Sequence, residues 1–345
     1  MNDFKGTPGY DHWIARKIGC ERRMSRALLE RYQVDRLNTV IRHAYARSSF
    51  YKRHLRECRD VPLVSPADLE RLPFTTPQDV RDSGLKMLCV NQGGISRVVT
   101  LPTSGTTGQP KRLYFTDQDQ ALSLDAFVQS MSQLVRAGDL VYILLPAKRP
   151  GGVGDLLHQA VSRLHAVPVK YGLVSNLPEM LEHLLKLPIR CLVGIPVQVL
   201  ALTRYFALKS AGRPVALRNV LLCTDHVSRA IREEVQQIWD CRVFDYYGMT
   251  EAGFCGGMEC PAHCGYHLHE ADLYIEIIDP ESGRAAPEGY EGEVVVSTLT
   301  RCGMPLLRYR TGDLSRFVPG FCSCGSILRR IEKIRARKTG LVSMG

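Results

Sequence analysis

A run of small hydroxylated residues and glycines is the feature of this sequence best suited to chemistry. It reads Thr103-Ser104-Gly105-Thr106-Thr107-Gly108 and is followed by Gln109-Pro110-Lys111. These residue types let the backbone approach a phosphate closely, and they offer N–H groups, hydroxyl donors and then an ammonium group. The pattern G-x-x-x-x-G-K-[ST] fails here, because Pro110 replaces its second glycine and Arg112 follows the lysine. We therefore expect a phosphate-binding loop of another kind, and a polar turn between two strands is the alternative.

Two later stretches combine aromatic, hydroxyl and carboxylate side chains at short spacing. They are Tyr246-Tyr247-Gly248-Met249-Thr250-Glu251 and Tyr309-Arg310-Thr311-Gly312-Asp313. Taken alone, the second stretch is also compatible with a β-turn in which the aspartate acts as a local cap. Their meaning therefore depends on their order along the chain after the first run.

Cysteine and histidine gather in the last third of the chain. Six of the twelve cysteines are scattered before residue 250, and the others are Cys255, Cys260, Cys264, Cys302, Cys322 and Cys324, with His263, His267 and His269 among them. Four thiolate or imidazole ligands make a closed tetrahedral zinc site, which is structural because no position is left for water. The spacing predicts a structural zinc in this region, and unligated thiols on neighbouring loops are the alternative.

The elements that must position these residues alternate between short apolar runs and helical patterns. Helical spacing runs from Arg22 to about Leu55, and Ser65-Pro66 and Thr76-Pro77 are typical helix starts. Buried strands are predicted at Leu140–Leu145, Cys191–Ile195, Val220–Cys223 and Arg242–Tyr246, with helices at Leu177–Leu187, Val199–Lys209 and Arg229–Trp239. This alternation predicts an α/β fold with a largely parallel sheet. After residue 270, strands at Leu273–Ile278, Glu293–Thr298 and Arg308–Asp313 predict a β-rich subdomain.

Composition limits the class of protein. The chain has 345 residues, of which 45% are hydrophobic and 23% charged, which is typical of a globular protein with a sizeable core. No apolar run reaches the ~18–20 residues that span a bilayer, and the first twenty residues lack a signal-peptide layout, so we expect a soluble, cytoplasmic protein without a membrane partner. The net charge of +10 fits a solvated basic face or an anionic nucleotide ligand. It does not favour nucleic acid, because no recognition-module signature is present.

Taken in order, the three stretches resemble the signature motifs of adenylate-forming enzymes: the acyl- and aryl-CoA ligases, the adenylation domains of peptide synthetases and the luciferases. The chain is most similar to the phenylacetate–CoA ligase branch over about residues 25 to 338. The segments that carry this finer resemblance are Arg42-His43-Ala44-Tyr45, Phe50-Tyr51, Met258-Glu259-Cys260, Glu276-Ile277-Ile278-Asp279-Pro280 and Pro305-Leu306-Leu307-Arg308-Tyr309.

The resemblance implies a role for each matching position. The Thr103–Lys111 loop would close over the β- and γ-phosphates of ATP, and Tyr246, Tyr247 and Gly248, followed by Met249, would line the adenine side. Thr250 would hold the α-phosphate, Glu251 would hold Mg²⁺, and Asp313 and Arg337 would contact the ribose. Lys111, Thr250 and Glu251 are thus the expected catalytic residues. Attack of a carboxylate on the α-phosphorus builds negative charge, which donors, a cation and Mg²⁺ stabilise.

Some positions depart from the family pattern. Leu222-Cys223-Thr224-Asp225 stands where the branch usually has a Gly-Ala-Glu-like segment, so Thr224 and Asp225 are the expected adenine contacts there. The segment Pro146–Gly154 replaces the aromatic-rich stretch of the aryl pocket, and its two cations would suit either a second anionic group on the substrate or a solvated loop. By the same resemblance the zinc ligands are Cys260, His267, Cys322 and Cys324, with Cys264, His263 and His269 as substitutes.

The expected organisation is a helical segment over 1–95, an AMP-binding core over 96–330 that is β-rich from about 270, and the start of a hinge over 331–345. Relatives carry a C-terminal domain with a catalytic lysine beyond the hinge, so the chain would be truncated, dependent on a partner or a non-catalytic remnant. The implied function is ATP-dependent activation of an aromatic, phenylacetate-like acid, then thioester formation with coenzyme A or a carrier-protein thiol. The alternatives are a non-catalytic nucleotide- or acyl-adenylate-binding module and a partner-dependent adenylation subunit. A homodimer is a further expectation from the family.

Overall fold

The computed structural model describes residues 9–21, 24–58, 62–101, 110–210 and 212–337. Contacts divide the chain into two units. Unit 1 contains residues 1–122, 249–256 and 267–345, and unit 2 contains residues 123–248 and 257–266. The domain boundaries predicted at residues 95 and 330 follow the sequence motifs instead of the contacts between residues, and they stay predictions.

Local sequence signals set the helix starts in the N-terminal part of unit 1. Its helices are α1 (Gly9–Lys17), α2 (Arg26–Arg47), α3 (Ser49–His54), η1 (Pro66–Arg71), α4 (Pro77–Ser83), η2 (Gly84–Met87) and η3 (Gln92–Gly94). At α4 the Thr76 hydroxyl accepts from the Asp79 N–H at 3.1 Å, and the Asp79 carboxylate accepts from the Thr76 N–H at 2.8 Å. This capping box, with proline at the first helical position, confirms the helix start predicted at Thr76-Pro77.

Most of the described strands of unit 1 form two small antiparallel sheets. Strands β1 (Arg97–Leu101) and β2 (Lys111–Phe115) pair antiparallel, and β10 (Leu273–Ile278), β11 (Gly292–Thr298), β12 (Tyr309–Ser315) and β14 (Ala336–Arg337) form a four-stranded sheet in that order. The short strands β9 (Tyr266–Leu268) and β13 (Arg330–Ile331) are neighbours. The β-rich pattern predicted after residue 270 is therefore confirmed.

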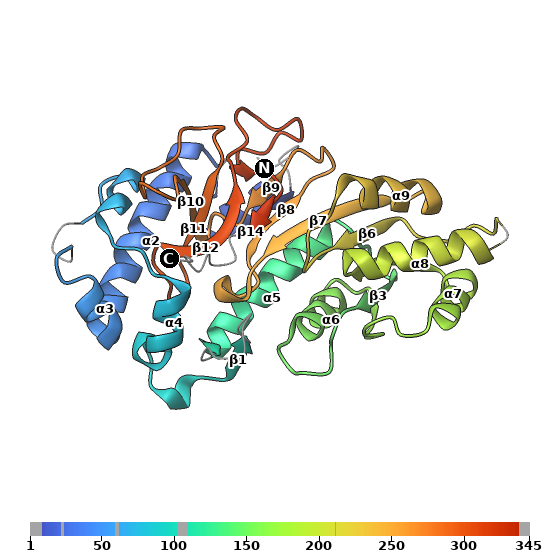
Figure 1. The fold of residues 1–345 in the computed structure, drawn as a ribbon, viewed down its shortest axis with the longest axis horizontal. Coiled ribbons are helices and arrows are strands. Elements are labelled where there is room, and N and C mark those ends of the chain that lie inside the picture. The colour runs from blue at the N-terminus through green and yellow to red at the C-terminus, as the bar shows by residue number, and fades with distance from the viewer. Residues whose placement is uncertain (1–8, 22–23, 59–61, 102–109, 211, 338–345) are drawn as a thin grey trace, which may run out of the picture. The chain divides into compact units, whose positions relative to one another are not determined.

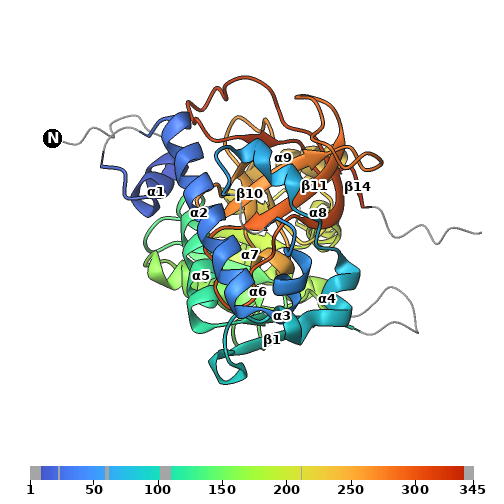
Figure 2. The same ribbon diagram turned by 90° about the vertical axis from the view of Figure 1, so that its left-hand side faces the viewer.

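Helix α2 contributes the central part of the unit 1 core. Its residues Leu37, Val40, Ile41 and Ala44 are buried together with residues of α3, of β2 and of the segment Leu299–Tyr309. In Figure 2, α2 runs down the picture and α3 lies near its lower end. Residues distant in sequence thus share one core, so α2 and α3 support the strand that carries Lys111.

Unit 2 is built around a parallel sheet. Its order is β8 (Gly256–Glu259), β7 (Arg242–Gly248), β6 (Asn219–Leu222), β5 (Ile189–Gly194), β3 (Leu140–Leu144) and β4 (Val167–Val169). The pairings among β7, β6, β5, β3 and β4 are all parallel. The predicted α/β class and the four predicted strands are confirmed.

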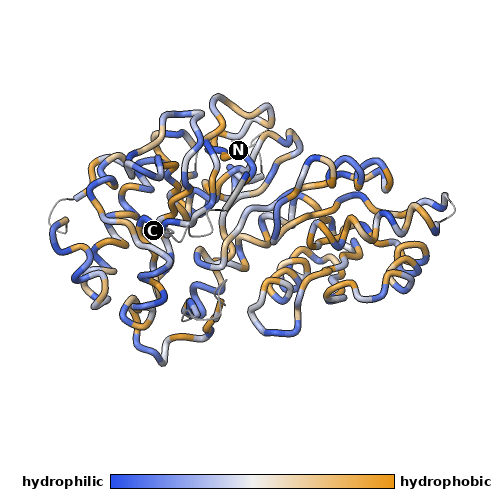
Figure 3. Tube along the Cα trace, viewed as in Figure 1, coloured by the Kyte–Doolittle hydropathy of each residue, from blue (hydrophilic) through white to orange (hydrophobic). Residues whose placement is uncertain are grey.

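One face of this sheet is covered by α7 (Leu177–Lys186), α8 (Pro196–Lys209) and α9 (Arg229–Trp239), which share a buried cluster with alternate strand residues (Figure 1). Along α8 and α9 hydrophobic and hydrophilic segments alternate, as expected for helices with one buried face (Figure 3). The same part of the chain also contains the helices α5 (Asp117–Ser132) and α6 (Val153–Arg163). Among the described residues, no helix combines the length and apolar character needed to cross a bilayer.

Candidate active site

Three side chains from distant parts of unit 1 meet at the start of β2. The Lys111 ammonium group forms an ion pair with the Glu251 carboxylate and donates to the Tyr309 hydroxyl at 3.0 Å. The Tyr309 hydroxyl donates to the same carboxylate at 3.3 Å. The side chains of Lys111 and Glu251 are each 14% exposed. One residue from each of the three predicted motifs therefore lies in a single, partly solvated charged cluster, which we call the Lys111 cluster.

Arg301, which sequence reasoning missed, fastens this cluster. Its guanidinium donates to the backbone carbonyl of Glu251 and to that of Tyr114 at 2.8 Å. The same group lies over the Phe115 ring, 4.2 Å from the ring centroid. Burial lowers the pKa of Arg301 from its usual value, but a guanidinium stays charged over the physiological range. The signal in the sequence is a cation three residues after a buried strand, which by itself predicts nothing specific.

The third motif lies on β12, where a turn-forming glycine and a buried carboxylate follow each other. Gly312 has φ +77°, a conformation that favours glycine, and its N–H donates to Glu293 at 3.0 Å. Asp313 is buried, and it lies opposite Arg337 in the register of β12 and β14. The structure therefore brings together the backbone positions of the two residues expected at the ribose.

The chain before α4 is tied to the same strand. The Thr75 N–H donates to the carbonyl of Arg308 at 3.1 Å, and the Arg310 N–H donates to the carbonyl of Thr75 at 2.9 Å. Arg308 is buried, paired with Glu276 at 2.9 Å, and donates to the Leu72 carbonyl at 2.8 Å. Because β12 is held on both sides of Tyr309, the tyrosine reaches Lys111 from a fixed backbone.

The first part of the second motif lies on β7 in unit 2. Tyr246 and Tyr247 are buried, and Tyr247 stacks on Tyr266 with ring centroids 5.9 Å apart. The Tyr266 hydroxyl donates to the Asp245 carboxylate at 2.7 Å. Burial and this carboxylate raise the pKa of Tyr266 well above its ordinary value, so its phenol remains a proton donor. The ring beneath Tyr247 is thereby fixed in orientation.

A buried ion pair that includes Glu259 of the neighbouring strand β8 also holds β7 in place. The Glu259 carboxylate accepts from the Asp245 N–H at 3.0 Å and from the Arg232 guanidinium at 2.5 Å. Arg232 also donates to the Val243 carbonyl at 3.0 Å. We call Arg232, Asp245, Glu259 and Tyr266 the β7 network. It links α9, β7 and β8, so it fixes the backbone that carries the two motif tyrosines.

The predicted adenine segment has a strained backbone. Thr224, two residues after the end of β6, has φ +74°, which is a conformation that a β-branched residue rarely adopts. Asp225 is exposed, and its carboxylate accepts from the neighbouring His226 N–H at 2.7 Å. Strain of this kind persists where the surroundings enforce it and is concentrated at functional sites. The geometry therefore suits a binding segment, although the residues differ from the family pattern.

Other predicted residues are placed less completely. Thr103 to Gly108 lie outside the described residues. Met249 is buried before the short helix η4 (Thr250–Ala252), which carries Thr250 and Glu251, and Gly248 is exposed at the end of β7. In the segment Pro146–Gly154, Lys148 and Arg149 are both exposed, as a solvated loop would be.

Three of the four predicted zinc ligands lie together in unit 1. The candidate ligand atoms of His267, Cys322 and Cys324 all lie within 4.8 Å of one another, and His267 Nε2 is 3.4 Å from Cys324 Sγ. Two ligands at about 2.1 and 2.3 Å from a tetrahedral zinc would lie about 3.6 Å apart. Cys260 is buried after β8 in unit 2. The donor set of His267, Cys322 and Cys324 fits zinc, and the ion itself stays a prediction.

The three substitute ligands have other surroundings. His269 is fully buried, accepts or donates one hydrogen bond with the Tyr10 hydroxyl at 2.9 Å, and stacks on the Tyr10 ring. Burial lowers the pKa of His269 to about 3. His263 lies beside Arg232 in unit 2, with 2.7 Å between His263 Nδ1 and the guanidinium, and Cys264 is exposed. These contacts favour a packing role for His269.

Comparison with known proteins places the chain in a family. The sequence profile of the family described as AMP-binding enzyme matches residues 27–300, a span that includes the first two motifs. The phenylacetate-coenzyme A ligase of Thermus thermophilus is 29% identical over 324 residues, covering 91% of this chain and 71% of that enzyme. The enzyme of the same name from Pseudomonas putida is 28% identical over 336 residues, covering 91% of this chain and 72% of that enzyme.

Solved structures show the same fold. A 2-hydroxyisobutyryl-CoA ligase, solved in complex with 2-HIB-AMP and CoA, superposes with a TM-score of 0.79 at 22% identity, over 90% of this chain and 69% of that one. A long-chain-fatty-acid-CoA ligase from Archaeoglobus fulgidus gives a TM-score of 0.52 at 16% identity, over 70% of this chain and 51% of that one. At these identities the likeness concerns the architecture, which is that of adenylate-forming ligases.

Proposed function

The chain belongs to the family of AMP-binding enzymes, and from this premise we propose that it activates an aromatic carboxylic acid of the phenylacetate kind for transfer to coenzyme A. The coarse activity, that of an AMP-forming CoA ligase, follows from the family and from the phenylacetate-coenzyme A ligases that it resembles over nine-tenths of its length. The finer choice of an aromatic acid is supported by those relatives alone.

The observation that carries the proposal is the Lys111 cluster. Lys111 and Glu251 come from motifs 140 residues apart, and Lys111 and Tyr309 from motifs 198 residues apart, yet their side chains touch. A cation and a carboxylate in a partly solvated site are the groups that an ATP·Mg²⁺ complex requires, since one binds phosphate oxygens and the other binds the metal.

In the proposed first half-reaction, a carboxylate oxygen of the acid attacks the α-phosphorus of ATP. The bond from the α-phosphorus to the bridging oxygen breaks, and pyrophosphate leaves with that oxygen. Lys111 stabilises charge on the departing phosphates, Thr250 donates to the α-phosphate, and Asp313 accepts from the ribose hydroxyls. In the second half-reaction, the thiol of coenzyme A attacks the acyl carbon, the acyl–oxygen bond breaks, and AMP leaves.

Two metals have candidate positions in this scheme. Glu251 would hold Mg²⁺, which neutralises phosphate charge when bound. The Glu251 carboxylate is held in position by its ion pair with Lys111. Cys260, His267, Cys322 and Cys324 would hold a structural zinc. That ion would fasten the loop before β13 to β9 and take no part in the reaction.

Exchange of labelled pyrophosphate into ATP, dependent on added acid, tests the first half-reaction without coenzyme A. We expect exchange with phenylacetate, and thioester formation when coenzyme A is added. Lys111→Gln should strongly slow exchange, whereas Lys186→Gln, which alters an exposed lysine on α7, should leave it unchanged. Exchange with aliphatic but not aromatic acids would overturn the substrate class. AMP binding without exchange for any acid would instead support a nucleotide-binding module.

A further inference from the structure

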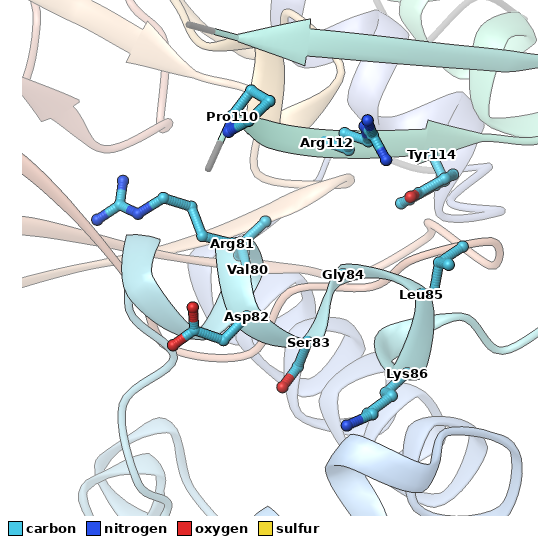
Figure 4. Close-up of a pocket in the computed structure, with 10 residues that line it drawn as sticks. All are labelled: Val80, Arg81, Asp82, Ser83, Gly84, Leu85, Lys86, Pro110, Arg112 and Tyr114. Carbon is cyan, nitrogen blue, oxygen red and sulfur yellow. The ribbon is translucent and has the colours of Figure 1, made fainter. Parts of the chain in front are cut away.

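A pocket separate from the Lys111 cluster lies between β2 and the α4–η2 segment (Figure 4). Its volume is about 460 Å³, within the ~300–1,000 Å³ range of small-molecule sites. The lining residues are Val80, Arg81, Asp82, Ser83, Gly84, Leu85, Lys86, Pro110, Arg112 and Tyr114. At the floor, a Cβ on Gly84 would contact the Arg112 carbonyl and the Tyr114 ring at 3.5 Å each, so helix and strand approach closely there.

The alternation of side chains along β2 gives this strand two functional faces. Successive residues of a strand point to opposite faces. Lys111 reaches Glu251 and Tyr309, and Phe115 lies under Arg301, whereas Arg112 and Tyr114 line the pocket. The strand that follows the predicted phosphate loop therefore presents one cation to the proposed adenylation site and the next cation to this pocket.

The pocket is rich in positive charge. Arg81, Lys86 and Arg112 line it against a single carboxylate, Asp82. Gln78 bridges the adjacent charged residues Arg81 and Asp82. Its amide oxygen accepts from Arg81 Nε at 3.0 Å, and its amide nitrogen donates to the Asp82 carboxylate at 2.8 Å. Among the described residues, no carboxylate forms an ion pair with Arg81, Lys86 or Arg112. The excess charge is therefore available to an anion.

We propose that this pocket binds a diphosphate group. The inference rests on the proposed function, because the proposed reaction supplies two sources of such a group. One source is the pyrophosphate that adenylation releases, and the other is the diphosphate of coenzyme A. Two arginines and a lysine bind phosphate oxygens through charge-assisted hydrogen bonds, and the polar residues Ser83 and Tyr114 also belong to the lining. Val80 and Leu85 add apolar surface that would suit the organic part of coenzyme A.

Calorimetric titration with pyrophosphate and with coenzyme A tests the proposal. A non-hydrolysable ATP analogue is added first at saturation, so that the phosphate-loop site cannot take either ligand. The variant is the double substitution Lys86→Gln/Arg112→Gln. The control is Lys186→Gln/Arg229→Gln, which removes the same two charge types from exposed positions on α7 and α9. We expect at least one of the two ligands to bind about tenfold more weakly to the first variant, and equally well to the control and the unaltered chain.

Each outcome is decisive. Loss of pyrophosphate affinity alone assigns the pocket to the product, loss of coenzyme A affinity alone assigns it to the thiol substrate, and loss of both supports the shared chemistry. Equal weakening in both double variants, or no binding to the unaltered chain, would overturn the inference. Pyrophosphate exchange separates the two proposals, since exchange with unchanged affinities refutes the pocket alone, and pocket binding without exchange refutes the proposed function alone.

Discussion

The Lys111 cluster in unit 1 and the β7 network in unit 2 are both built from charged and tyrosine side chains, but they are assembled differently. In the cluster, residues 140 and 198 positions apart meet with side chains that keep 14% exposure. In the network, partners are 14 to 27 positions apart, and the Glu259 side chain has no exposure. The difference indicates that the network fixes a strand permanently, whereas the cluster can exchange its internal partners for a charged ligand.

Disruption of the β7 network should have the largest effect on stability. Glu259→Leu would leave the Arg232 guanidinium buried without its carboxylate, and breaking such a pair costs about 3–5 kcal/mol. Chemical unfolding monitored by circular dichroism measures this loss. The double variant Arg232→Met/Glu259→Leu should recover much of it, because both charges are then absent. A loss below about 1 kcal/mol in the single variant would show that the network does not fix the strand.

The Lys111 cluster should respond in activity rather than stability. Lys111→Gln is expected to slow acid-dependent pyrophosphate exchange by about 10²–10³-fold, because it removes a charged donor from the departing phosphates. AMP lacks those phosphates, so AMP affinity should stay unchanged in the same variant. A large loss of AMP affinity would mean that Lys111 supports the fold of the site instead of the phosphates.

The zinc ligands test a third kind of constraint within unit 1. Cys324→Ser should reduce the zinc content from about one equivalent per chain and lower the unfolding temperature, as metal removal by a chelator should do for the unaltered chain. Cys58→Ser is the matched control, because Cys58 is not a candidate zinc ligand and its thiol donates to the Arg71 carbonyl at 3.0 Å. Metal analysis by emission spectroscopy measures both variants, and zinc-free protein with unaltered stability would contradict the assignment.

The smallest effect is expected beneath Tyr247. Tyr266→Phe keeps the ring stack and removes the donor to Asp245, which should cost about 1–3 kcal/mol in unfolding free energy. Nucleotide affinity should change less than in Glu259→Leu, since the β7 backbone stays in place. If the two substitutions reduced nucleotide affinity equally, the orientation of the Tyr266 ring would matter as much as the position of the β7 backbone, which would contradict this account.

Short-range features were predictable from the sequence. The helix start at Thr76-Pro77 and the parallel strands of unit 2 follow from capping residues and apolar runs. Helix α1 was not predicted: nine residues do not form a stable helix alone, and its Tyr10 and Trp13 pack on His269, more than 250 positions away.

The candidate site divides in the same way. The motifs that carry Lys111, Glu251 and Asp313 are recognisable locally, and the resemblance supplies their order. The contact of Tyr309 with Lys111 and the role of Arg301 depend on the packing of β12 and on the turn after β11. Neither has a local pattern, so neither could be predicted.

Calorimetric titration of the purified chain with AMP and with Mg·ATP, beside Asp313→Ala, tests the central claim that the three motifs form one nucleotide site. The account predicts binding of both nucleotides to the unaltered chain, weakened in the variant by more than about 1.5 kcal/mol because charge-assisted hydrogen bonds to the ribose are lost. Equal affinity in the two proteins, or no binding to the unaltered chain, would contradict it.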